Sequence, residues 1–203
     1  ADLNSVQPQA GLAHAIRSEL PDDGIAVADS TQVGYWSWGG FPVYQPRTFL
    51  TSGYQGTLGF GFPTALGAQV GNPDKKVISI NGDGGFMFNV QELSSAAQHK
   101  INLVTVVFDD GAYGNVRRIQ RQSFGGRTIA SDLQNPDFVK LAEAFGIRAA
   151  RAGGSDTLRS AVREAFKANE PSLIVVPVAE MPNMFHLYRG RQAAPPPPLP
   201  VKR

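Results

Sequence analysis

Three stretches of this chain are apolar at nearly every position, without the alternation of a strand that has one face in water. They are residues 76–80, 101–108 and 172–178. Strands buried on both faces are typical of parallel sheets covered by helices. Helix-like and shorter strand-like stretches surround them, with helices expected over 8–20, 89–98, 135–146 and 157–168 and strands over 25–29 and 147–152. This alternation predicts an α/β fold: a doubly wound, mainly parallel sheet with helices on both faces.

The size of the chain fits one domain. A sequence of 203 residues that is 42% hydrophobic can bury one sizeable core. We expect this domain to cover residues 1–185. Residues 186–203 are expected to form a C-terminal segment, and its Pro-rich end at 193–203 to be disordered or a linker.

Composition and charge exclude several kinds of site. The chain has no cysteine, so disulfides, thiolate metal sites and cysteine-bound iron–sulfur clusters are excluded. The formal net charge is +2 and the basic residues are scattered, so no nucleic-acid partner is expected. No apolar run is as long as a membrane span, and the N-terminus lacks the pattern of a secretory signal. We therefore expect no membrane contact and a cytoplasmic protein.

Acidic residues follow two of the expected strands. Asp83 comes just after residues 76–80, in ISINGDGG, and Asp109 and Asp110 come just after 101–108, in VVFDDGAYG. Because the carboxyl ends of parallel strands share one edge of the sheet, we expect Asp83 and Asp110 to lie close together. Two carboxylates at such an edge suit Mg²⁺ and an accompanying phosphate group.

The glycines around Asp83 support a phosphate site. Gly82, Gly84 and Gly85 carry no Cβ, so backbone N–H groups can approach phosphate oxygens closely. A helix that starts at Asn89, with Glu92 completing a capping box, is expected to add its positive end. An ordinary turn is the alternative for an isolated Gly-Asp-Gly, but the second acidic strand end favours the metal and phosphate site.

The common nucleotide-binding loops are absent. The chain has no G-x-x-x-x-G-K-[ST] segment. Met87 stands where G-x-G-x-x-G needs its third glycine after Gly82 and Gly84. Neither a simple nucleoside triphosphate nor NAD is therefore predicted.

The acidic strand ends resemble a known cofactor motif. Gly82-Asp83-Gly84, 24 further residues and Asp109-Asp110 resemble the thiamine diphosphate motif, in which Gly-Asp-Gly precedes an Asn-Asn pair. The stretches GTLGFGFPTALGAQ, QELSSAAQHKINLVTVVFDDGAYGNVRRIQ and NPDFVKLAEAFG are similar to those of acetolactate synthase and its relatives. The resemblance covers roughly residues 10–180 and implies the thiamine diphosphate-binding fold, as the C-terminal diphosphate-binding (PP) domain of such enzymes.

The resemblance implies a role for individual residues. Asp83, the side chain of Asp110 and the carbonyl of Ala112 would ligate Mg²⁺, although the family has asparagines where Asp109 and Asp110 stand. Leu58 would be the apolar wedge under the bent cofactor, where acetolactate synthases usually have Met; a plain core leucine is the alternative. Gln32 would lie near the terminal phosphate. The cofactor-binding set as a whole is Gln32, Gly56, Leu58, Gly82, Asp83, Gly84, Gly85, Phe86, Asp110, Ala112, Tyr113 and Gly114.

The resemblance also implies that half of the active site is supplied from elsewhere. In such enzymes a glutamate from a pyrimidine-binding (PYR) domain holds the cofactor's pyrimidine ring, and no PYR-like sequence is found here. Glu92 is expected to cap a helix instead. We expect either a subunit of a split enzyme or a C-terminal piece of a longer one, in a homodimer or homotetramer or with a PYR-bearing chain. The aromatic and glycine-rich residues 31–41 and 53–62 are the expected contact surface.

The implied activity is carbon–carbon bond chemistry on a 2-oxoacid, as a decarboxylase or carboligase. Two alternatives stay open. One is a subunit of a 2-oxoacid oxidoreductase, although the absence of cysteine argues against the type with iron–sulfur clusters. The other is a thiamine diphosphate-binding module without turnover. The walls of the substrate pocket are expected on the PYR side, so the sequence names neither the 2-oxoacid nor the acceptor.

Overall fold

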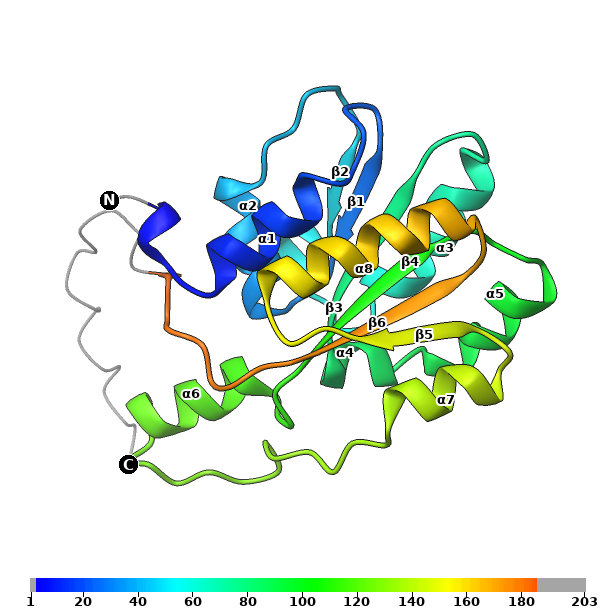
Figure 1. Ribbon diagram of the computed structural model, residues 1–203. Coiled ribbons are helices and arrows are strands. Elements are labelled where there is room, and N and C mark those ends of the chain that lie inside the picture. Colours follow the sequence, from blue (N-terminus) through cyan, green and yellow to red (C-terminus); the bar gives the residue numbers. More distant parts are fainter. Residues whose placement is uncertain (1–2, 186–203) are drawn as a thin grey trace.

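The computed structural model describes residues 3–185 and contains one six-stranded sheet (Figure 1). Its strands follow the order β2-β1-β3-β4-β6-β5, and every neighbouring pair is parallel. The strands are β1 (Ile25–Ala28), β2 (Phe49–Thr51), β3 (Val77–Gly82), β4 (Val104–Asp109), β5 (Arg148–Arg151) and β6 (Ser172–Pro177). The predicted doubly wound α/β fold is confirmed.

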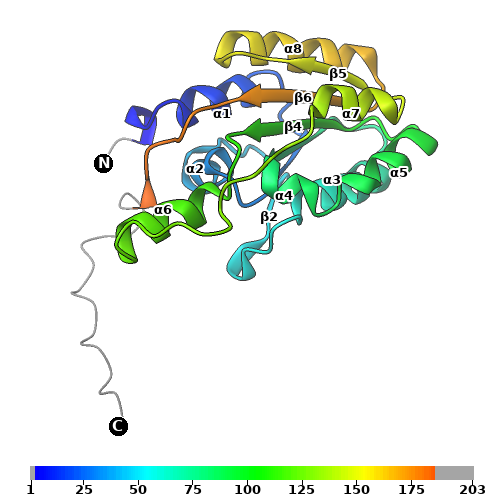
Figure 2. The ribbon, with the colours of Figure 1, turned by 90° about the horizontal axis from the view of Figure 1, so that it is seen from below.

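Helices cover both faces of this sheet (Figure 2). One face carries α1 (Gln9–Arg17), α2 (Gln32–Gly40) and α8 (Ser155–Ala168). The other carries α3 (Gly61–Gly71), α4 (Asp83–Met87), α5 (Leu93–Gln98) and α7 (Phe138–Ala144), with α6 (Gly114–Ser123) beyond the strand ends. Short 3₁₀ turns are η1 (Leu3–Ser5), η2 (Gly53–Gln55) and η3 (Val90–Glu92).

The central strands bury both of their faces. On β3, Ile78 and Ile80 join the core under α1, α2 and α8, whereas Val77 joins the opposite core. On β4, Val106 belongs to the core under α1, α2 and α8, and Val107 belongs to the opposite core. Side chains alternate between the two faces of a strand, so a run of apolar residues is what two covered faces require.

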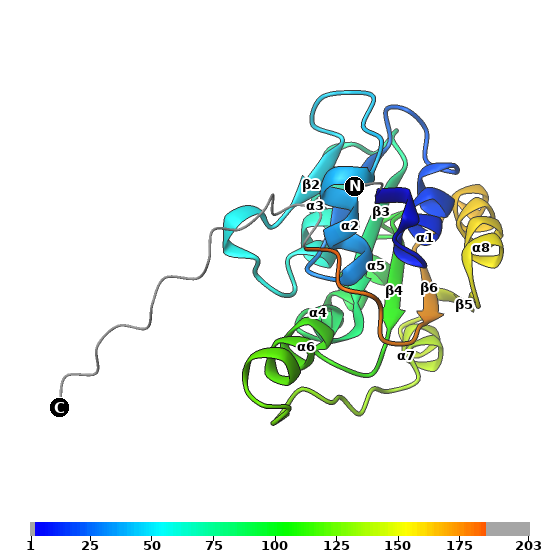
Figure 3. The same cartoon turned by 90° about the vertical axis from the view of Figure 1, so that its left-hand side faces the viewer.

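The register places the ends of β3 and β4 beside each other. Gly82 is paired with Phe108, and Asp109 is paired with Pro177 of β6. Figure 3 looks toward this carboxyl edge, with α2, α4 and α6 around it. The residues that directly follow β3 and β4 therefore meet at one end of the sheet, as ligand sites of open α/β sheets do.

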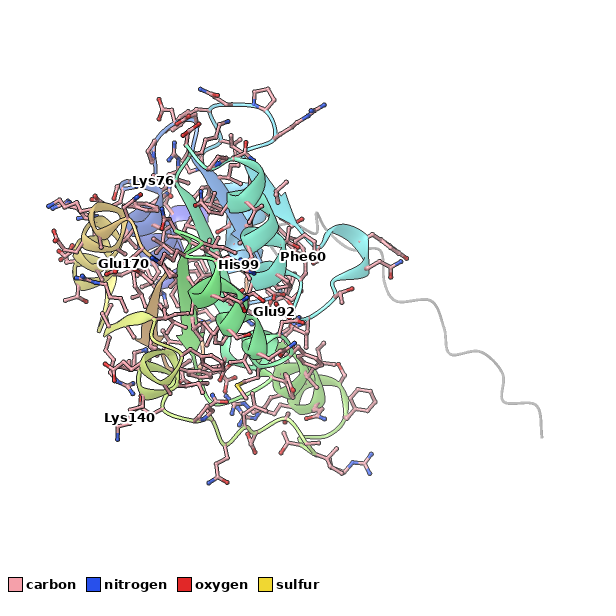
Figure 4. The ribbon with its side chains drawn as sticks, turned by 90° about the vertical axis from the view of Figure 1, so that its right-hand side faces the viewer. Phe60, Lys76, Glu92, His99, Lys140 and Glu170 are labelled. Carbon is pink, nitrogen blue, oxygen red and sulfur yellow. The ribbon has the colours of Figure 1, made fainter. Side chains whose placement is uncertain are left out.

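The expected helix start at Asn89 is wrong. The chain turns into α4 directly at Asp83, and α5 begins only at Leu93. Instead of capping a helix, Asn89 Nδ2 donates to the carbonyl of Gly59 over 2.8 Å. Glu92 Oε2 accepts from Ser95 Oγ at 2.7 Å; Glu92 and His99 bracket α5 (Figure 4). A distant partner thus replaces the local capping box.

Like the short helix α4, the elements β2, α2 and α6 were not expected from the sequence. β2 is a short edge strand of three half-buried residues. α2 forms from the aromatic, glycine-rich stretch 31–41, and its Trp36 is fully buried, with the indole N–H donating to the Leu3 carbonyl at 2.9 Å. The prediction that this stretch is mainly contact surface is therefore wrong for most of its aromatic residues, although Trp38 is 42% exposed.

Over residues 3–185, none of the helices has the length and apolar character needed to cross a bilayer. The C-terminal segment predicted for residues 186–203 lies outside the described residues.

Candidate active site

A pocket of about 290 Å³ opens at the carboxyl edge of the sheet. Every residue predicted for cofactor binding lines it, with the exception of Phe86. It is lined by Ser30, Thr31, Gln32, Tyr35, Gly56, Leu58, Gly82, Asp83, Gly84, Gly85, Phe108, Asp110, Ala112, Tyr113, Gly114, Asn115, Val116, Val178 and Met181. Residues far apart in the sequence thus form one cavity.

Phe86 points away from the pocket. Its ring is buried between Phe62 and Phe138. The centroid of the Phe86 ring lies 5.1 Å from that of Phe62 and 5.9 Å from that of Phe138. Only the backbone of Phe86 is expected to contact the cofactor. It directly follows Gly84 and Gly85, which line the pocket. The side chain itself anchors the short helix α4 in the core.

Asp83 is buried and held by three donors. Its Oδ1 accepts from the N–H of Gly84 at 2.8 Å. Its Oδ2 accepts from the N–H of Gly111 at 2.9 Å and from Asn135 Nδ2 at 2.6 Å. Burial raises the pKa of Asp83, and these hydrogen bonds act in the opposite direction. Asp83 is therefore fixed in one orientation at the end of β3.

Asp110 lies close to Asp83 across the strand ends. Burial, and then the neighbouring Asp83 carboxylate, raise the pKa of Asp110 to about 6, while Arg117 opposes the rise. A carboxyl group is perturbed in this way when it is desolvated beside a like charge. The two acids form a concentrated negative site that a cation would neutralise.

Asn135 and Asp109 also take part in this acidic site. Asn135 Nδ2 lies 2.8 Å from Asp109 Oδ1 in addition to its contact with Asp83. The sequence motif did not point to Asn135, because it lies 52 positions beyond Asp83. The only local signal was its place before Pro136 and the helix-capping Asp137.

The wall beside the acids has no room for side chains. A Cβ on Gly84 would lie 2.6 Å from the ring of Tyr113, and a Cβ on Gly114 would lie 2.6 Å from Asp110 Oδ2. Distances under 3 Å between a Cβ and such atoms are essentially never seen. These glycines let the backbone reach the pocket surface next to the acids.

The loop that carries Leu58 is clamped by Asp29, which sequence reasoning missed. Asp29 is 1% exposed, and its Oδ2 accepts from the N–H groups of Gly59 at 3.1 Å and Gly61 at 3.0 Å. Gly59 has a φ of +82°, and its carbonyl is held by Asn89. Leu58 is thus fixed by its neighbour and presents a partly exposed side chain to the pocket.

Two polar groups face the pocket from α2. The Oε1 atom of Gln32 is buried and has no hydrogen-bond partner in the described part of the chain. Tyr35 lines the pocket as well, although residues 31–41 were expected to form a contact surface. An unpartnered buried amide is unusual and suggests that a ligand group belongs there.

The segment after β6 closes one side of the pocket with Val178 and Met181. It is tied to α6 by Glu180, whose Oε2 lies 2.5 Å from Arg121 Nη1. Gln9 Nε2 of α1 donates to the carbonyl of Pro182 at 2.8 Å. The pocket is therefore bounded by the loops after β1, β2, β3, β4 and β6.

Comparison with known families decides what kind of domain this is. Residues 29–176 match the model described as thiamine pyrophosphate enzyme, C-terminal TPP binding domain. The chain belongs to this family. Thiamine pyrophosphate is the same compound as thiamine diphosphate, so the expected family is confirmed and, with it, thiamine diphosphate as the cofactor. The accompanying Mg²⁺ stays a prediction.

Curated relatives agree with this assignment. The chain is 43% identical over 151 residues to the probable acetolactate synthase large subunit of Methanococcus aeolicus, covering 74% of this chain and 25% of that protein. It is 36% identical over 177 residues to acetolactate synthase isozyme 2 large subunit of Escherichia coli, covering 87% and 32%. The chain thus spans about a quarter to a third of the length of these relatives.

A solved structure shows the same fold. It is a thiamine diphosphate-dependent 4-hydroxybenzoylformate decarboxylase from Rhodococcus jostii RHA1, with a TM-score of 0.78 and 32% identity. The match covers 88% of this chain and 34% of that one. The doubly wound sheet is therefore that of thiamine pyrophosphate-binding domains.

The pocket fits a diphosphate held by a divalent cation. The paired acids supply hard oxygen ligands, the glycines bring backbone close to the cavity, and Gln32 leaves a buried polar atom free. Over residues 3–185 no three Asp, Glu, His or Cys side chains gather as a metal site. A cation held by two carboxylates would complete its coordination with phosphate oxygens, water or a backbone carbonyl, and the carbonyl of Ala112 is the one expected.

Proposed function

We propose that this chain is the Mg²⁺- and thiamine diphosphate-binding part of a 2-oxoacid decarboxylase or carboligase of the acetolactate synthase kind. The observation that carries the proposal is the meeting of Asp83, Asp110, several glycines and Leu58 in one pocket. The activity of the similar solved enzyme supports the substrate class, since 4-hydroxybenzoylformate is a 2-oxoacid. A cytoplasmic location remains part of the proposal.

Each wall of the pocket has a distinct task in this proposal. Asp83, Asp110 and the carbonyl of Ala112 hold Mg²⁺, which offsets the charge of a diphosphate group. The backbone of Gly84, Gly85 and Phe86 would hold the diphosphate, with Gly82, Tyr113 and Gly114 also contributing and Gln32 near its terminal phosphate. Gly56 and Leu58 also line the pocket, and Leu58 would support the rings of the cofactor.

When bound, the cofactor supplies an electron sink for carbon–carbon bond cleavage and formation. The contribution of this chain is orientation. Asp29 and Asn89 fix Gly59, so Leu58 cannot move with a flexible loop. Val178 and Met181 make the side of the pocket near α2 apolar, which excludes water from that region.

The remaining half of the active site is proposed to come from a PYR domain on another chain or on another part of a longer enzyme. Apolar side chains support a partner on this side of the molecule. Tyr54 of η2 is fully exposed. Met87 at the end of α4, Phe88 directly after it and Val116 on α6 are 38 to 55% exposed. A homodimer or homotetramer, or a complex with a PYR-bearing chain, would cover such residues.

The test is release of CO₂ from pyruvate by residues 1–203 with thiamine diphosphate and Mg²⁺, with and without a PYR-bearing partner. We expect turnover only with the partner. Cofactor binding without turnover in both mixtures would instead identify a non-catalytic binding module. Turnover that depends on an added electron acceptor would identify an oxidoreductase subunit.

A further inference from the structure

Asn135 lies between two carboxylates, that of Asp83 directly after β3 and that of Asp109 at the end of β4. Its Nδ2 atom is 2.6 Å from Oδ2 of Asp83 and 2.8 Å from Oδ1 of Asp109. An ionised carboxylate only accepts hydrogen bonds, so the amide nitrogen, with its two hydrogens, is the atom that satisfies both contacts. One neutral side chain thus joins the ends of β3 and β4.

The backbone on both sides of Asn135 is fixed. The N–H of Leu133 donates to the carbonyl of Gly111 at 2.8 Å, which ties this segment to the loop after β4. Pro136 follows directly and disfavours a helical conformation at Asn135. Asp137 then caps α7 by accepting from the N–H of Val139 at 3.0 Å. Asn135 is therefore presented to the acids by ordered chain.

Asn135 determines which oxygen of Asp83 has room for another ligand. Oδ2 accepts two hydrogen bonds, from Gly111 and from Asn135, whereas Oδ1 accepts one from Gly84 within the described residues. Each carboxylate oxygen has two lone pairs. The capacity of Oδ2 is therefore used, and Oδ1 keeps one lone pair for a further ligand.

We propose that Asn135 is a positioning residue that holds Asp83 ready for the divalent cation, an inference that rests on the proposed function. Its neutrality is essential. A lysine or arginine at this position could also join the two carboxylates, but it would cancel the negative charge that attracts the cation. Asparagine lowers the repulsion between Asp83 and Asp109 and leaves their charge in place.

The experiment measures the affinity of the chain for Mg²⁺ in the presence of thiamine diphosphate, by calorimetry on residues 1–203. Asn135→Ala is expected to raise the apparent Kd for Mg²⁺ roughly ten- to a hundredfold, the loss expected for one hydrogen bond to a charged group. At saturating Mg²⁺ the affinity for thiamine diphosphate is expected to return to that of the unmodified chain. Gln134→Ala, a change at the exposed neighbouring position, is the control and should change neither value.

A second variant and a second measurement separate positioning from folding. Asn135→Ser keeps a short donor and is expected to bind Mg²⁺ with intermediate affinity; it decides the question if Asn135→Ala does not fold. Thermal unfolding in EDTA reports any effect on stability alone. Variants that unfold at lower temperature but keep the Mg²⁺ Kd within twofold would overturn the inference.

The failure of the proposed function gives a different result. If the unmodified chain binds no thiamine diphosphate at any Mg²⁺ concentration, both the proposed function and this inference fall. If the unmodified chain binds and all Asn135 variants bind equally well, the inference alone falls.

Discussion

Asp83 and Asp110 face the same pocket but differ in how they are held. Asp83 accepts hydrogen bonds from two backbone N–H groups and from Asn135. For Asp110, burial and the charge of Asp83 have the largest effects, and together they raise its pKa to about 6. Asp83 is thus the more firmly held carboxylate of the pair, and it is the more informative residue to remove.

Asp83→Ala is expected to abolish Mg²⁺-dependent binding of thiamine diphosphate. Loss of one partner from a buried charged site costs about 3–5 kcal/mol, or more than about a hundredfold in affinity. Calorimetry measures the effect. Asp74→Ala, which removes an exposed carboxylate near the other end of β3, is the matched control. Comparable binding by the Asp83 and Asp74 variants would remove Asp83 from the metal site.

Leu58→Ala tests the wedge. The diphosphate and its cation provide most of the anchoring, so cofactor affinity should stay within about tenfold. Turnover of the complete enzyme should fall much more, because the bent cofactor loses its support. Leu66→Ala, a change at a core leucine outside the pocket, controls for general loss of packing. Unchanged kcat in the Leu58 variant would identify Leu58 as ordinary packing.

Sequence reasoning found the residues of the motif but missed those that hold them. Asp83 and Asp110 were predictable because each directly follows a recognisable buried strand. Asn135 and Asp29 contact the site through long-range hydrogen bonds, spanning 52 positions from Asn135 to Asp83 and 30 from Asp29 to Gly59. Nothing in the local sequence around Asn135 or Asp29 encodes such a partner.

At the scale of elements, the loop after β2 is fixed to β1 and α4 through Gly59. The Asp29 carboxylate binds the N–H of Gly59, and the Asn89 amide binds its carbonyl. The positive φ of Gly59 and the close approach of Asn89 and Phe88 exclude any side chain there. This arrangement turns a glycine-rich loop into a rigid part of the pocket.

Asp29→Ala is expected to lower the free energy of unfolding by about 1–3 kcal/mol for each buried N–H left without its acceptor. Asp29→Asn should cost less, because one amide oxygen can still accept from Gly59 and Gly61. Urea denaturation followed by circular dichroism measures both. Asp156→Ala, at a side chain that is 96% exposed, is the control and should show no measurable change. Equal stability of all three variants would show that the clamp is unimportant.

The unmodified chain and the Asp29→Asn variant also allow a test of how stability depends on pH. Burial raises the pKa of Asp29 above its usual value of 3.8, so the folded chain binds this proton more tightly than the unfolded chain. Stability should therefore rise relative to Asp29→Asn as the pH falls through the folded-state pKa, and the difference should level off below about 3.8. If the difference in unfolding free energy between the unmodified chain and Asp29→Asn does not change with pH, the pKa of Asp29 is not raised in the folded chain.

Buried elements were easier to predict than edge elements. β3, β4 and β6 are apolar on both faces, and their sequences show it directly. β2 is short and half-buried, and α2 is rich in glycine and aromatic residues, so neither has a clear period. α6 has no buried residue, and its side chains make ion pairs with distant residues, such as Arg121–Glu180. The formation of β2, α2 and α6 therefore depends on tertiary contacts, which a local sequence pattern does not show.

At the scale of the whole molecule, the pocket opens beside exposed apolar side chains that a partner would cover. We predict that residues 1–203 associate in solution with another copy or with a PYR-bearing chain. Light scattering or sedimentation measures this directly. Tyr54→Ser, at a fully exposed ring on η2, should weaken the association, whereas Val70→Ser, at an exposed residue on α3, is the control. A monomer that releases CO₂ from pyruvate without a partner would contradict the half-site account.

The most direct test of the account is calorimetric titration of residues 1–203 with thiamine diphosphate, first in Mg²⁺ and then in EDTA. The acidic pair at the strand ends repels a diphosphate unless a divalent cation lies between them. We therefore expect saturable binding in Mg²⁺ and none in EDTA. Equal affinity in the two buffers would contradict the assignment of Asp83 and Asp110 as ligands of a cation that holds the cofactor.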